Sequence, residues 1–421
     1  MARYDTIRTL LAVAASRNMK LKQFDVKTAF LYGELEEEVY LEQPEGFDDG
    51  SGHVCRLKRS LYGLKQAPRC WNKRFISFME KVGLKNSSAD PCLFYRTHEG
   101  SFLSIAIYVD DGLVIGNKDK EIEMFLKLMQ EEFRITIGSL ENFLGMQVKC
   151  QIDGSISVSQ ESYTNKILQK FNMAEAKGVS TPASREESNN HKDISGKVPY
   201  REAMGSLMYL AAATRPDIAF AVNKAARVMD KPAEKDWNNV RRIFRYLRST
   251  SNYGLRYTRG PAKLKVFSDA DFAGDEVTRH STTGVIATFA DSAVSWTSQL
   301  QKTTALSTTE AEIIAASEGA KELVWLKRLL SELLPDFVKE TTVLYIDNAS
   351  AIKLTKNPEY HKRSKHIEVR HFYVRERYLN GDFRIEHIDG RRQPADLLTK
   401  PIEHARFKVL CCEVRITPRE Q

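Results

Sequence analysis

Two carboxylates at the tip of an apolar hairpin constrain this chain more than any other feature. Two apolar runs, residues 103–109 and 113–115, flank the tripeptide Asp110-Asp111-Gly112. An Asp-Gly step between apolar runs is a strong hairpin signal, so we expect two antiparallel strands with their turn at this tripeptide. Adjacent carboxylates repel one another, and a bound divalent cation offsets that repulsion. Taken alone, the tripeptide is explained more simply as turn chemistry.

A second set of acidic residues falls at element ends in the last third of the chain. From residue 264 the pattern predicts a strand, a hairpin and then helices alternating with strands. Asp269 and Asp347 close strands, Glu312 lies near the start of a helix that runs to about residue 334, and Asp396 begins a helix after Pro394. One acidic residue at such a place carries little information, whereas four in this order form a specific pattern.

Glu310 and Glu312 compete for one position in that pattern. Two residues apart on a helix, they point about 200° away from each other. Ser307 and Glu310 form a capping box, which gives Glu310 a role at the helix start. We therefore predict that Glu312 faces the site, and that Asp269 is a stronger candidate than Asp271, which lies past the strand end. Glu312 also shares its helix face with small residues that permit close approach to a sheet, namely Ala315, Ala316 and Gly319.

Charge and cysteine usage narrow the class of protein. Lys and Arg number 63 against 55 Asp and Glu, a net charge of +8. A basic balance suits a polyanionic partner, although a basic protein without one accounts for the charge more simply. The six cysteines form no CxxC pair, which favours a reduced compartment. The chain has neither an apolar run of membrane-spanning length nor the apolar core of a signal peptide, so we expect a soluble intracellular protein.

Two breaks divide the chain. The polar stretch of residues 181–199 indicates a surface loop, and the step Arg259-Gly260-Pro261 precedes a new strand. Between these breaks we expect helices at residues 204–213, 218–229 and 237–248. The last of them carries Arg241, Arg245 and Arg248 on one face. Contact with phosphates and a solvated basic face explain that arrangement equally well.

Three blocks near the N-terminus resemble the reverse transcriptases of copia-type retrotransposons. The sequence Tyr108-Val109-Asp110-Asp111 matches their YxDD signature, and QFDVKTAFL at residues 23–31 resembles the motif that carries the first metal-binding aspartate. SLYGLKQAPRCW at residues 60–71 resembles the motif that lies against the incoming nucleotide and template. Stretches at residues 142–148, 200–210 and 214–218 also resemble the family, without a catalytic role.

The later acidic set resembles a ribonuclease H of the same elements. The matching motifs are SDADFAGD at residues 268–275, STTEAE at 307–312, YIDN at 345–348 and PADLLTK at 394–400. In total the resemblance covers nearly all of residues 2–401. It implies an α+β reverse-transcriptase palm and thumb, followed by an α/β ribonuclease H-like fold with a mixed five-stranded sheet.

The resemblance also implies a domain order. We expect a palm at residues 1–150, a mostly helical thumb and connection at 151–260, a ribonuclease H-like domain at 261–401 and a tail at 402–421. Only 24 residues precede Asp25, so we expect the fingers, which hold the triphosphate, to be missing and the polymerase to be impaired.

The implied activities are RNA-directed DNA polymerase and RNA–DNA hybrid ribonuclease, each using two Mg²⁺ ions, with Mn²⁺ as a substitute. Phe30, Tyr62 and Lys65 are expected to contact the nucleotide. Phe30 would select deoxynucleotides, unless it is only a core aromatic. The expected metal-binding and catalytic carboxylates are Asp25, Asp110 and Asp111 in the polymerase, and Asp269, Glu312, Asp347 and Asp396 in the nuclease.

The partners implied are an RNA template, a DNA primer, an RNA–DNA hybrid, deoxynucleoside triphosphates and other parts of the Pol polyprotein. The implied location is intracellular, in cytoplasmic virus-like particles with access to the nucleus. Two alternatives stay open: a nuclease whose palm only binds the hybrid, and a non-catalytic nucleic-acid-binding remnant.

Overall fold

The computed structural model describes residues 1–98, 100–185, 191–339, 342–356 and 368–419. The chain folds into two compact units, each assembled from two stretches of sequence. Unit 1 comprises Met1–Thr6 and Met19–Leu140, and unit 2 comprises Ile7–Asn18 and Glu141–Gln421. Among the described residues, no helix combines the length and apolar character that crossing a membrane requires.

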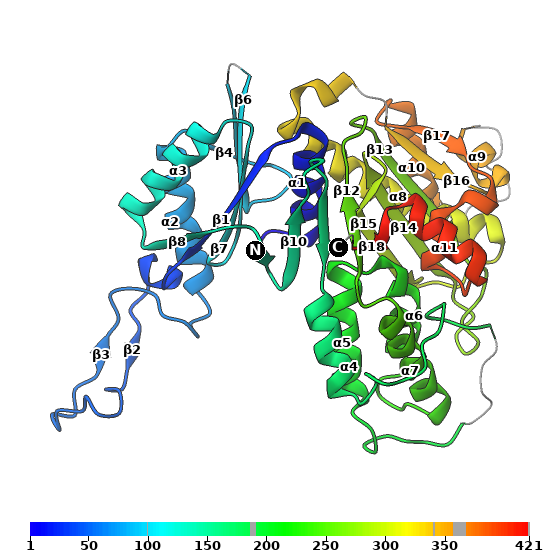
Figure 1. The fold of residues 1–421 in the computed structure, drawn as a ribbon, viewed down its shortest axis with the longest axis horizontal. Coiled ribbons are helices and arrows are strands. Elements are labelled where there is room, and N and C mark those ends of the chain that lie inside the picture. Colours follow the sequence, from blue (N-terminus) through cyan, green and yellow to red (C-terminus); the bar gives the residue numbers. More distant parts are fainter. Residues whose placement is uncertain (99, 186–190, 340–341, 357–367, 420–421) are drawn as a thin grey trace. The chain divides into compact units, whose positions relative to one another are not determined.

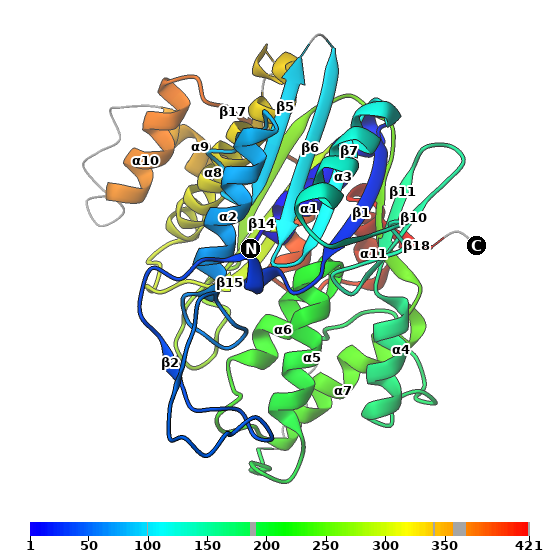
Figure 2. The same cartoon turned by 90° about the vertical axis from the view of Figure 1, so that its left-hand side faces the viewer.

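Unit 1 is built on a six-stranded antiparallel sheet with the order β4-β5-β6-β7-β1-β8. Helices α2 (Ala67–Lys81) and α3 (Asp119–Glu132) cover one face of this sheet, and Figure 2 shows both in front of its strands. A short helix, η1 (Ala29–Tyr32), follows β1, and two short strands, β2 (Tyr40–Leu41) and β3 (Cys55–Arg56), form a separate arm (Figure 1). The six strands are β1 (Lys20–Val26), β4 (Lys85–Asn86), β5 (Leu93–His98), β6 (Ser101–Tyr108), β7 (Asp111–Gly116) and β8 (Ile135–Gly138).

The expected hairpin is present, but its turn lies one residue earlier than predicted. Tyr108 at the end of β6 pairs with Asp111 at the start of β7, so the turn consists of Val109 and Asp110. Gly112 lies inside β7 and pairs with Phe24 of β1. A Cβ atom at Gly112 would overlap the Phe24 ring. The glycine is therefore required by side-chain packing and not by the turn.

One sheet of unit 2 is antiparallel and joins distant parts of the sequence. Its order is β18-β12-β11-β10-β9, so the strand β18 (Ile416–Pro418) pairs with β12 (Tyr253–Tyr257). The other three strands are β9 (Asn142–Phe143), β10 (Met146–Cys150) and β11 (Ile156–Ser159). A group of helices lies between β11 and β12 in the sequence (Figure 1). These are α4 (Glu161–Lys170), α5 (Tyr200–Ala213), η2 (Pro216–Ile218), α6 (Ala219–Ala226) and α7 (Glu234–Ser249). The helices predicted between residues 204 and 248 are thus confirmed.

The other sheet of unit 2 is mixed and five-stranded, as the family resemblance implies. Its order is β15-β14-β13-β16-β17, with β13, β14 and β15 antiparallel and β16 and β17 parallel to β13. These strands are β13 (Leu264–Ala270), β14 (Thr282–Phe289), β15 (Ser292–Leu300), β16 (Val343–Ile346) and β17 (Arg384–His387). The remaining helices are α8 (Thr308–Leu333), η3 (Pro335–Lys339), α9 (Ala349–Lys356), α10 (Glu368–Leu379), η6 (Gly390–Arg392), η7 (Pro394–Leu398) and α11 (His404–Glu413).

Helix α1 (Tyr4–Arg17) contributes most of its length to unit 2. Its Arg8 is 2% exposed and lies over the ring of Trp296, 3.7 Å from the guanidinium carbon to the ring centroid. The guanidinium donates to the carbonyl of Ala212 at 2.6 Å and to that of Val294 at 2.8 Å. This cation therefore satisfies carbonyl groups at the C-terminal end of α5, where the helix dipole favours positive charge.

Candidate metal centres

Three carboxylates converge in unit 2. Oxygen atoms of Asp269, Glu312 and Asp347 all lie within 4.8 Å of one another. Asp269 lies near the end of β13 and Asp347 directly follows β16, its parallel neighbour, so both residues come from the same edge of the sheet. Glu312 comes from α8, whose small residues allow close packing: a Cβ on Gly319 would lie 3.1 Å from Leu344 of β16. The structure thus brings together three of the four carboxylates that the sequence singled out in this half.

The surroundings of Glu312 disfavour an ionised carboxylate. The residue is 6% exposed, and its Oε2 atom has no hydrogen-bond partner within the described part of the chain. Burial raises the pKa of Glu312 well above its ordinary value, and the nearby charges of Asp269 and Asp347 raise it further. Burial also raises the pKa of Asp347, with a contribution from Asp269. A cation bound between these groups would offset both the burial and the repulsion.

Glu310 occupies the capping position instead. The Glu310 N–H donates to Ser307 Oγ at 3.1 Å, and the Glu310 carboxylate accepts from the Leu306 N–H at 2.7 Å. The capping box predicted from the sequence is therefore present, with the return bond reaching one residue further back. Helix geometry consequently directs Glu312, and not Glu310, to Asp269 and Asp347.

Asp396 and Asp271 lie outside this group of three. Asp396 is buried in η7, where its carboxylate pairs with Arg406 and, at 2.7 Å, with Lys400 Nζ. Lys400 Nζ also lies 3.4 Å from Asp269 Oδ2. A lysine ammonium therefore connects Asp269 with Asp396. Asp271 accepts the Thr282 N–H at the neighbouring strand.

Some contacts at this centre could not be predicted from motifs. His387 of β17 donates from Nε2 to the backbone carbonyl of Asp347 at 3.0 Å, although no motif assigns it a role. Lys400 lies four residues after Asp396, a spacing that indicates an ion pair on a helix. No such local signal exists for Arg406, because its contact depends on where α11 docks.

Two aspartates of unit 1 lie on adjacent strands, and a third lies in the turn beside them. Asp25 on β1 is directly opposite Asp111 on β7, and Asp110 lies in the turn, with its carbonyl accepting the Val26 N–H at 2.8 Å. Burial raises the pKa of Asp111, as do the charges of Asp110 and Asp25. Lys27 Nζ lies 2.6 Å from Asp25 Oδ1. Over the residues that the structure describes, these three do not form a group as close as that of Asp269, Glu312 and Asp347.

Two of the expected nucleotide-contacting residues, Phe30 and Tyr62, lie against each other. Phe30 of η1 packs against Tyr62, with ring centroids 4.5 Å apart. Burial raises the pKa of Tyr62, as does the charge of Asp110. Tyr62 is 52% exposed, and Lys65 is also exposed. Phe30 is half-buried, so it is not a fully enclosed core residue.

The arginines of α7 bind protein groups. Arg245 Nε donates to the Lys177 carbonyl at 2.7 Å, and Arg248 Nε donates to the Ala174 carbonyl at 2.5 Å. Arg242 Nη2 donates to Thr181 Oγ1 at 2.9 Å. These side chains therefore hold residues 174–181 against α7, while Arg241 on the same helix is exposed.

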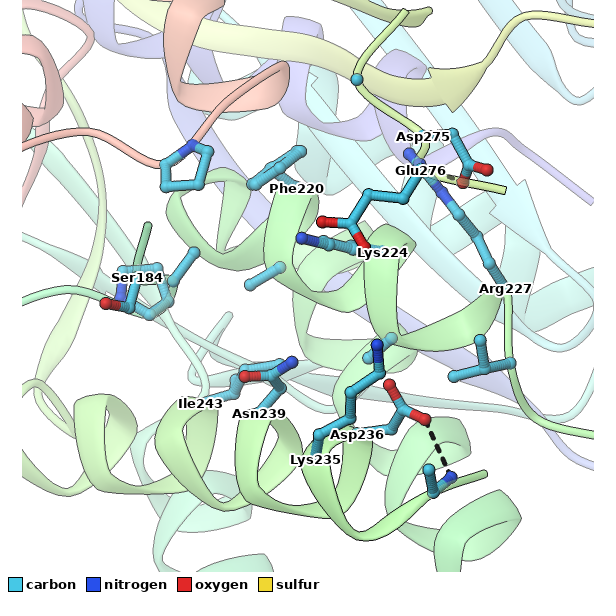
Figure 3. Close-up of a pocket in the computed structure, with 18 of the residues that line it drawn as sticks. Ser184, Phe220, Lys224, Arg227, Lys235, Asp236, Asn239, Ile243, Asp275 and Glu276 are labelled. Carbon is cyan, nitrogen blue, oxygen red and sulfur yellow. Dashed lines mark hydrogen bonds and ion pairs between the residues drawn. The ribbon is translucent and has the colours of Figure 1, made fainter. Parts of the chain in front are cut away.

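A cavity of about 300 Å³ lies in unit 2 beside residues 274–277 and Pro401 (Figure 3). Its floor is apolar, with Phe220 and Ile243, and its rim carries both signs of charge. Arg227 and Asp275 neutralise each other at 3.2 Å. The remaining charged lining residues are Lys224, Lys231, Lys235, Asp236 and Glu276.

Comparison with known proteins identifies the class of protein to which this chain belongs. Residues 1–185 match the family described as "Reverse transcriptase (RNA-dependent DNA polymerase)". The chain is 44% identical over 424 residues to the retrovirus-related Pol polyprotein from transposon TNT 1-94 of Nicotiana tabacum, covering 97% of this chain and 32% of that protein. It is 36% identical over 410 residues to the corresponding polyprotein from transposon RE2 of Arabidopsis thaliana, covering 96% of this chain and 28% of that protein.

A shorter relative is matched over its whole length. The putative transposon Ty5-1 protein YCL074W of Saccharomyces cerevisiae is 31% identical over 310 residues, covering 71% of this chain and 100% of that protein. This chain belongs to the family of copia-type retrotransposon Pol polyproteins, which confirms the resemblance seen in its motifs. It spans about a third of the length of the TNT 1-94 polyprotein.

Proposed function

We propose that this chain cleaves the RNA strand of RNA–DNA hybrids and carries the polymerase centre of its element. The observation that carries the nuclease is the convergence of Asp269, Glu312 and Asp347 within 4.8 Å. The proposed division is a palm at residues 1–150, a thumb and connection at 151–260, a ribonuclease H-like domain at 261–401 and a tail beyond. We place these activities inside the cell, in virus-like particles.

The residues of the nuclease centre fit divalent cations. Carboxylate oxygens are the donors that Mg²⁺ and Mn²⁺ prefer, and the unpartnered buried oxygen of Glu312 is suited to such a ligand. When bound, two such ions would activate a water molecule and stabilise the leaving 3′-oxygen of the RNA strand. Asp269, Glu312 and Asp347 would hold them, with Asp396 as the fourth ligand.

The side chains around the carboxylates keep them in place. Thr399 Oγ1 donates to Asp269, and Lys400 spans Asp269 and Asp396. His387 fixes the backbone carbonyl of Asp347. These contacts restrict the carboxylates before any ligand arrives, and such preorganisation lowers the cost of reaching the reactive geometry. Recognition of the hybrid would rest on its A-form shape and 2′-hydroxyls.

The polymerase centre has support from sequence and from strand pairing. The reverse transcriptase match covers residues 1–185, and β1 and β7 place Asp25 opposite Asp111. Asp25, Asp110 and Asp111 would hold two Mg²⁺ ions, with Phe30, Tyr62 and Lys65 against a deoxynucleoside triphosphate. An RNA template and a DNA primer complete the proposed substrates. A cation at this centre would compete with Lys27, which lies 2.6 Å from Asp25, as one at the nuclease centre would compete with Lys400.

The deciding experiment is cleavage of a labelled RNA strand annealed to DNA, with Mg²⁺ or Mn²⁺. We expect the wild-type chain to cleave, and Asp269→Asn or Asp347→Asn to lower the rate by at least about a hundredfold. Asp271→Asn is the matched control, because Asp271 lies outside the group of three. Equal cleavage by the wild type and Asp269→Asn would overturn the assignment.

A primer-extension assay on an RNA template separates the two activities. Extension that Asp110→Asn abolishes supports a working polymerase centre. Hybrid cleavage without extension favours a nuclease whose palm only binds the hybrid. Comparison with a form of the protein extended upstream of Met1 tests the sequence-based expectation of an impaired polymerase.

A further inference from the structure

A second cavity in unit 2, of about 750 Å³, lies between α7 and α11. Its walls also include residues 178–180, Tyr253 of β12 and Ile416 of β18. Small-molecule sites typically occupy roughly 300–1,000 Å³, so the cavity has the size of a ligand site. None of its lining residues belongs to the acidic group of Asp269, Glu312 and Asp347.

Residues 178–180 and Arg242 of α7 form one rim of this cavity. Arg242, Arg245 and Arg248 hold residues 174–181 on the helix through the hydrogen bonds described above. Gly178 permits the close approach, because a Cβ atom there would overlap Ser249 Oγ. The arginine hydrogen bonds and the close packing at Gly178 therefore hold this rim against α7.

Aromatic rings form the walls, and buried polar contacts fix them. The Tyr246 hydroxyl donates to Asp217 Oδ2 at 2.7 Å, and its ring meets Phe407 of α11 edge-on, with centroids 5.8 Å apart. Asp217 pairs with Arg215, both fully buried, and the Arg215 guanidinium carbon lies 5.9 Å from the Tyr253 ring centroid. Tyr253, which is half-buried, thus offers a ring against which a flat base can pack, while the buried Tyr246 and Phe407 form the wall behind it.

The charged lining residues of this cavity are all basic. They are Arg242 and Lys408; His404 also lines the cavity, and the lining contains no Asp or Glu among the described residues. The Nε atom of Arg242 is buried without a hydrogen-bond partner in the same described part of the chain. Burial lowers the pKa of Arg242, as does the charge of Arg245, so an anion there would be stabilising. The cavity of Figure 3 lacks this selectivity, because its rim mixes both signs of charge.

We propose that this cavity binds a nucleoside phosphate, with the base against Tyr253 and the phosphate at Arg242 and Lys408. Stacking on aromatic rings beside cationic groups is how proteins bind unpaired nucleotides with little regard to base identity. Arginine and lysine both form charge-assisted hydrogen bonds to phosphate. A free nucleotide and the terminal nucleotide of a single strand share this chemistry. The site goes beyond the proposed catalysis and requires neither acidic centre.

Binding can be measured on the full chain in EDTA, so that no metal-held nucleotide contributes. The probes are AMP, adenosine, and a six-nucleotide oligo(dA) that ends in 2-aminopurine, whose fluorescence is quenched by stacking. We expect saturable binding that falls with salt, because phosphate contacts release counterions. Adenosine, which lacks phosphate, should bind at least about tenfold more weakly than AMP.

Variants locate the site. Lys408→Gln and Tyr253→Ala should each weaken binding about tenfold, while Tyr253→Phe retains it. Arg241→Gln is the matched control, since Arg241 is exposed on the same helix and does not line the cavity. Competition by AMP assigns a free nucleotide, and competition by the oligonucleotide alone assigns a strand end. Absence of saturable binding, or binding unchanged in both Lys408→Gln and Tyr253→Ala, would overturn the proposal.

Discussion

Trp71 Nε1 donates a hydrogen bond to the backbone carbonyl of Val109 at 2.6 Å. Val109 is the first residue of the turn that carries Asp110, and its φ of 60° is rare for a β-branched side chain. Such a conformation costs energy that surrounding contacts must offset. Trp71 provides one of these contacts from the aromatic core of unit 1, where it packs against Phe75 and Phe133. The position of Asp110 therefore depends on a residue 39 positions earlier in the sequence.

Trp71→Phe removes the donor and leaves a smaller ring in the aromatic core. We expect a loss of about 1–3 kcal/mol in unfolding free energy, because a carbonyl at the turn loses its partner. We also expect weaker Mn²⁺ binding in unit 1, since Asp110 is positioned by that turn. Denaturant unfolding and Mn²⁺ titration by electron paramagnetic resonance, in an Asp269→Asn background, measure the two effects. Trp237→Phe controls for loss of an indole, and unchanged Mn²⁺ affinity in Trp71→Phe would limit its role to packing.

Gly112→Ala tests the packing of β7 on β1. The added Cβ meets the Phe24 ring, so we expect a cost of about 1–3 kcal/mol. Combining it with Phe24→Leu should cost less than the sum of the two single changes, because the smaller side chain makes room. Urea unfolding of the four proteins measures this coupling. Gly205→Ala in α5, where no atom lies within 4 Å of the new Cβ, should be neutral or stabilising. Additive costs for Gly112 and Phe24 would contradict the packing explanation.

The hairpin shows how far sequence patterns reach. Apolar runs predicted both strands, because alternation and length are local properties. The turn was misplaced because Gly112 follows an aspartate, as turn glycines often do. Its actual role depends on Phe24, a residue far away in the sequence that pairs with it only in the folded sheet.

The acidic group of unit 2 likewise combines features that local sequence patterns predict with contacts that they do not predict. Element ends and capping rules predicted the placement of Glu312 and Glu310, because both depend on one helix. Periodicity likewise predicted the shared face of the α7 arginines, but not the carbonyls of residues 174–181 that they bind. The contact of Arg406 with Asp396 required the docking of α11, in a stretch whose sequence predicted only a tail. Local sequence rules predict on which face of a helix a side chain lies and where an element ends. Tertiary packing determines which other residues contact that side chain.

Glu310→Gln and Glu312→Gln form a matched pair. Glu312→Gln should lower hybrid cleavage by at least about a hundredfold, because it removes a charged oxygen donor. Its stability should stay equal or rise, since a buried charge is lost. Glu310→Gln keeps an acceptor for the Leu306 N–H, so its activity and stability should both stay near wild type. Cleavage rates and melting temperatures decide between them, and loss of cleavage in Glu310→Gln alone would reverse the assignment.

Phe30→Val should relax sugar selection wherever primer extension is measurable. Phe30 packs on Tyr62, and a smaller side chain would leave room for a 2′-hydroxyl. We expect the ratio of ribonucleotide to deoxynucleotide incorporation to rise about tenfold or more, a change of about 1.4 kcal/mol in discrimination. Phe78→Leu, in the core of α2, should lower stability without changing the ratio. An unchanged ratio in Phe30→Val would leave Phe30 with a packing role only.

The metal-free protein should lose stability as pH rises above the ordinary carboxyl range. The folded-state pKa values of Glu312 and Asp347 are raised, so the folded chain binds more protons than the unfolded chain between the ordinary and the raised values. Stability is then present below about pH 4 and falls as pH increases through that window. Mg²⁺ should reverse the fall, so its stabilising effect should be larger at pH 8 than at pH 5. Melting temperatures in EDTA and in Mg²⁺, for the wild type and Glu312→Gln, measure both slopes. Because Glu312→Gln removes one of the titrating groups, its melting temperature should depend less on pH, and a slope equal to that of the wild type would show that the pH dependence arises elsewhere.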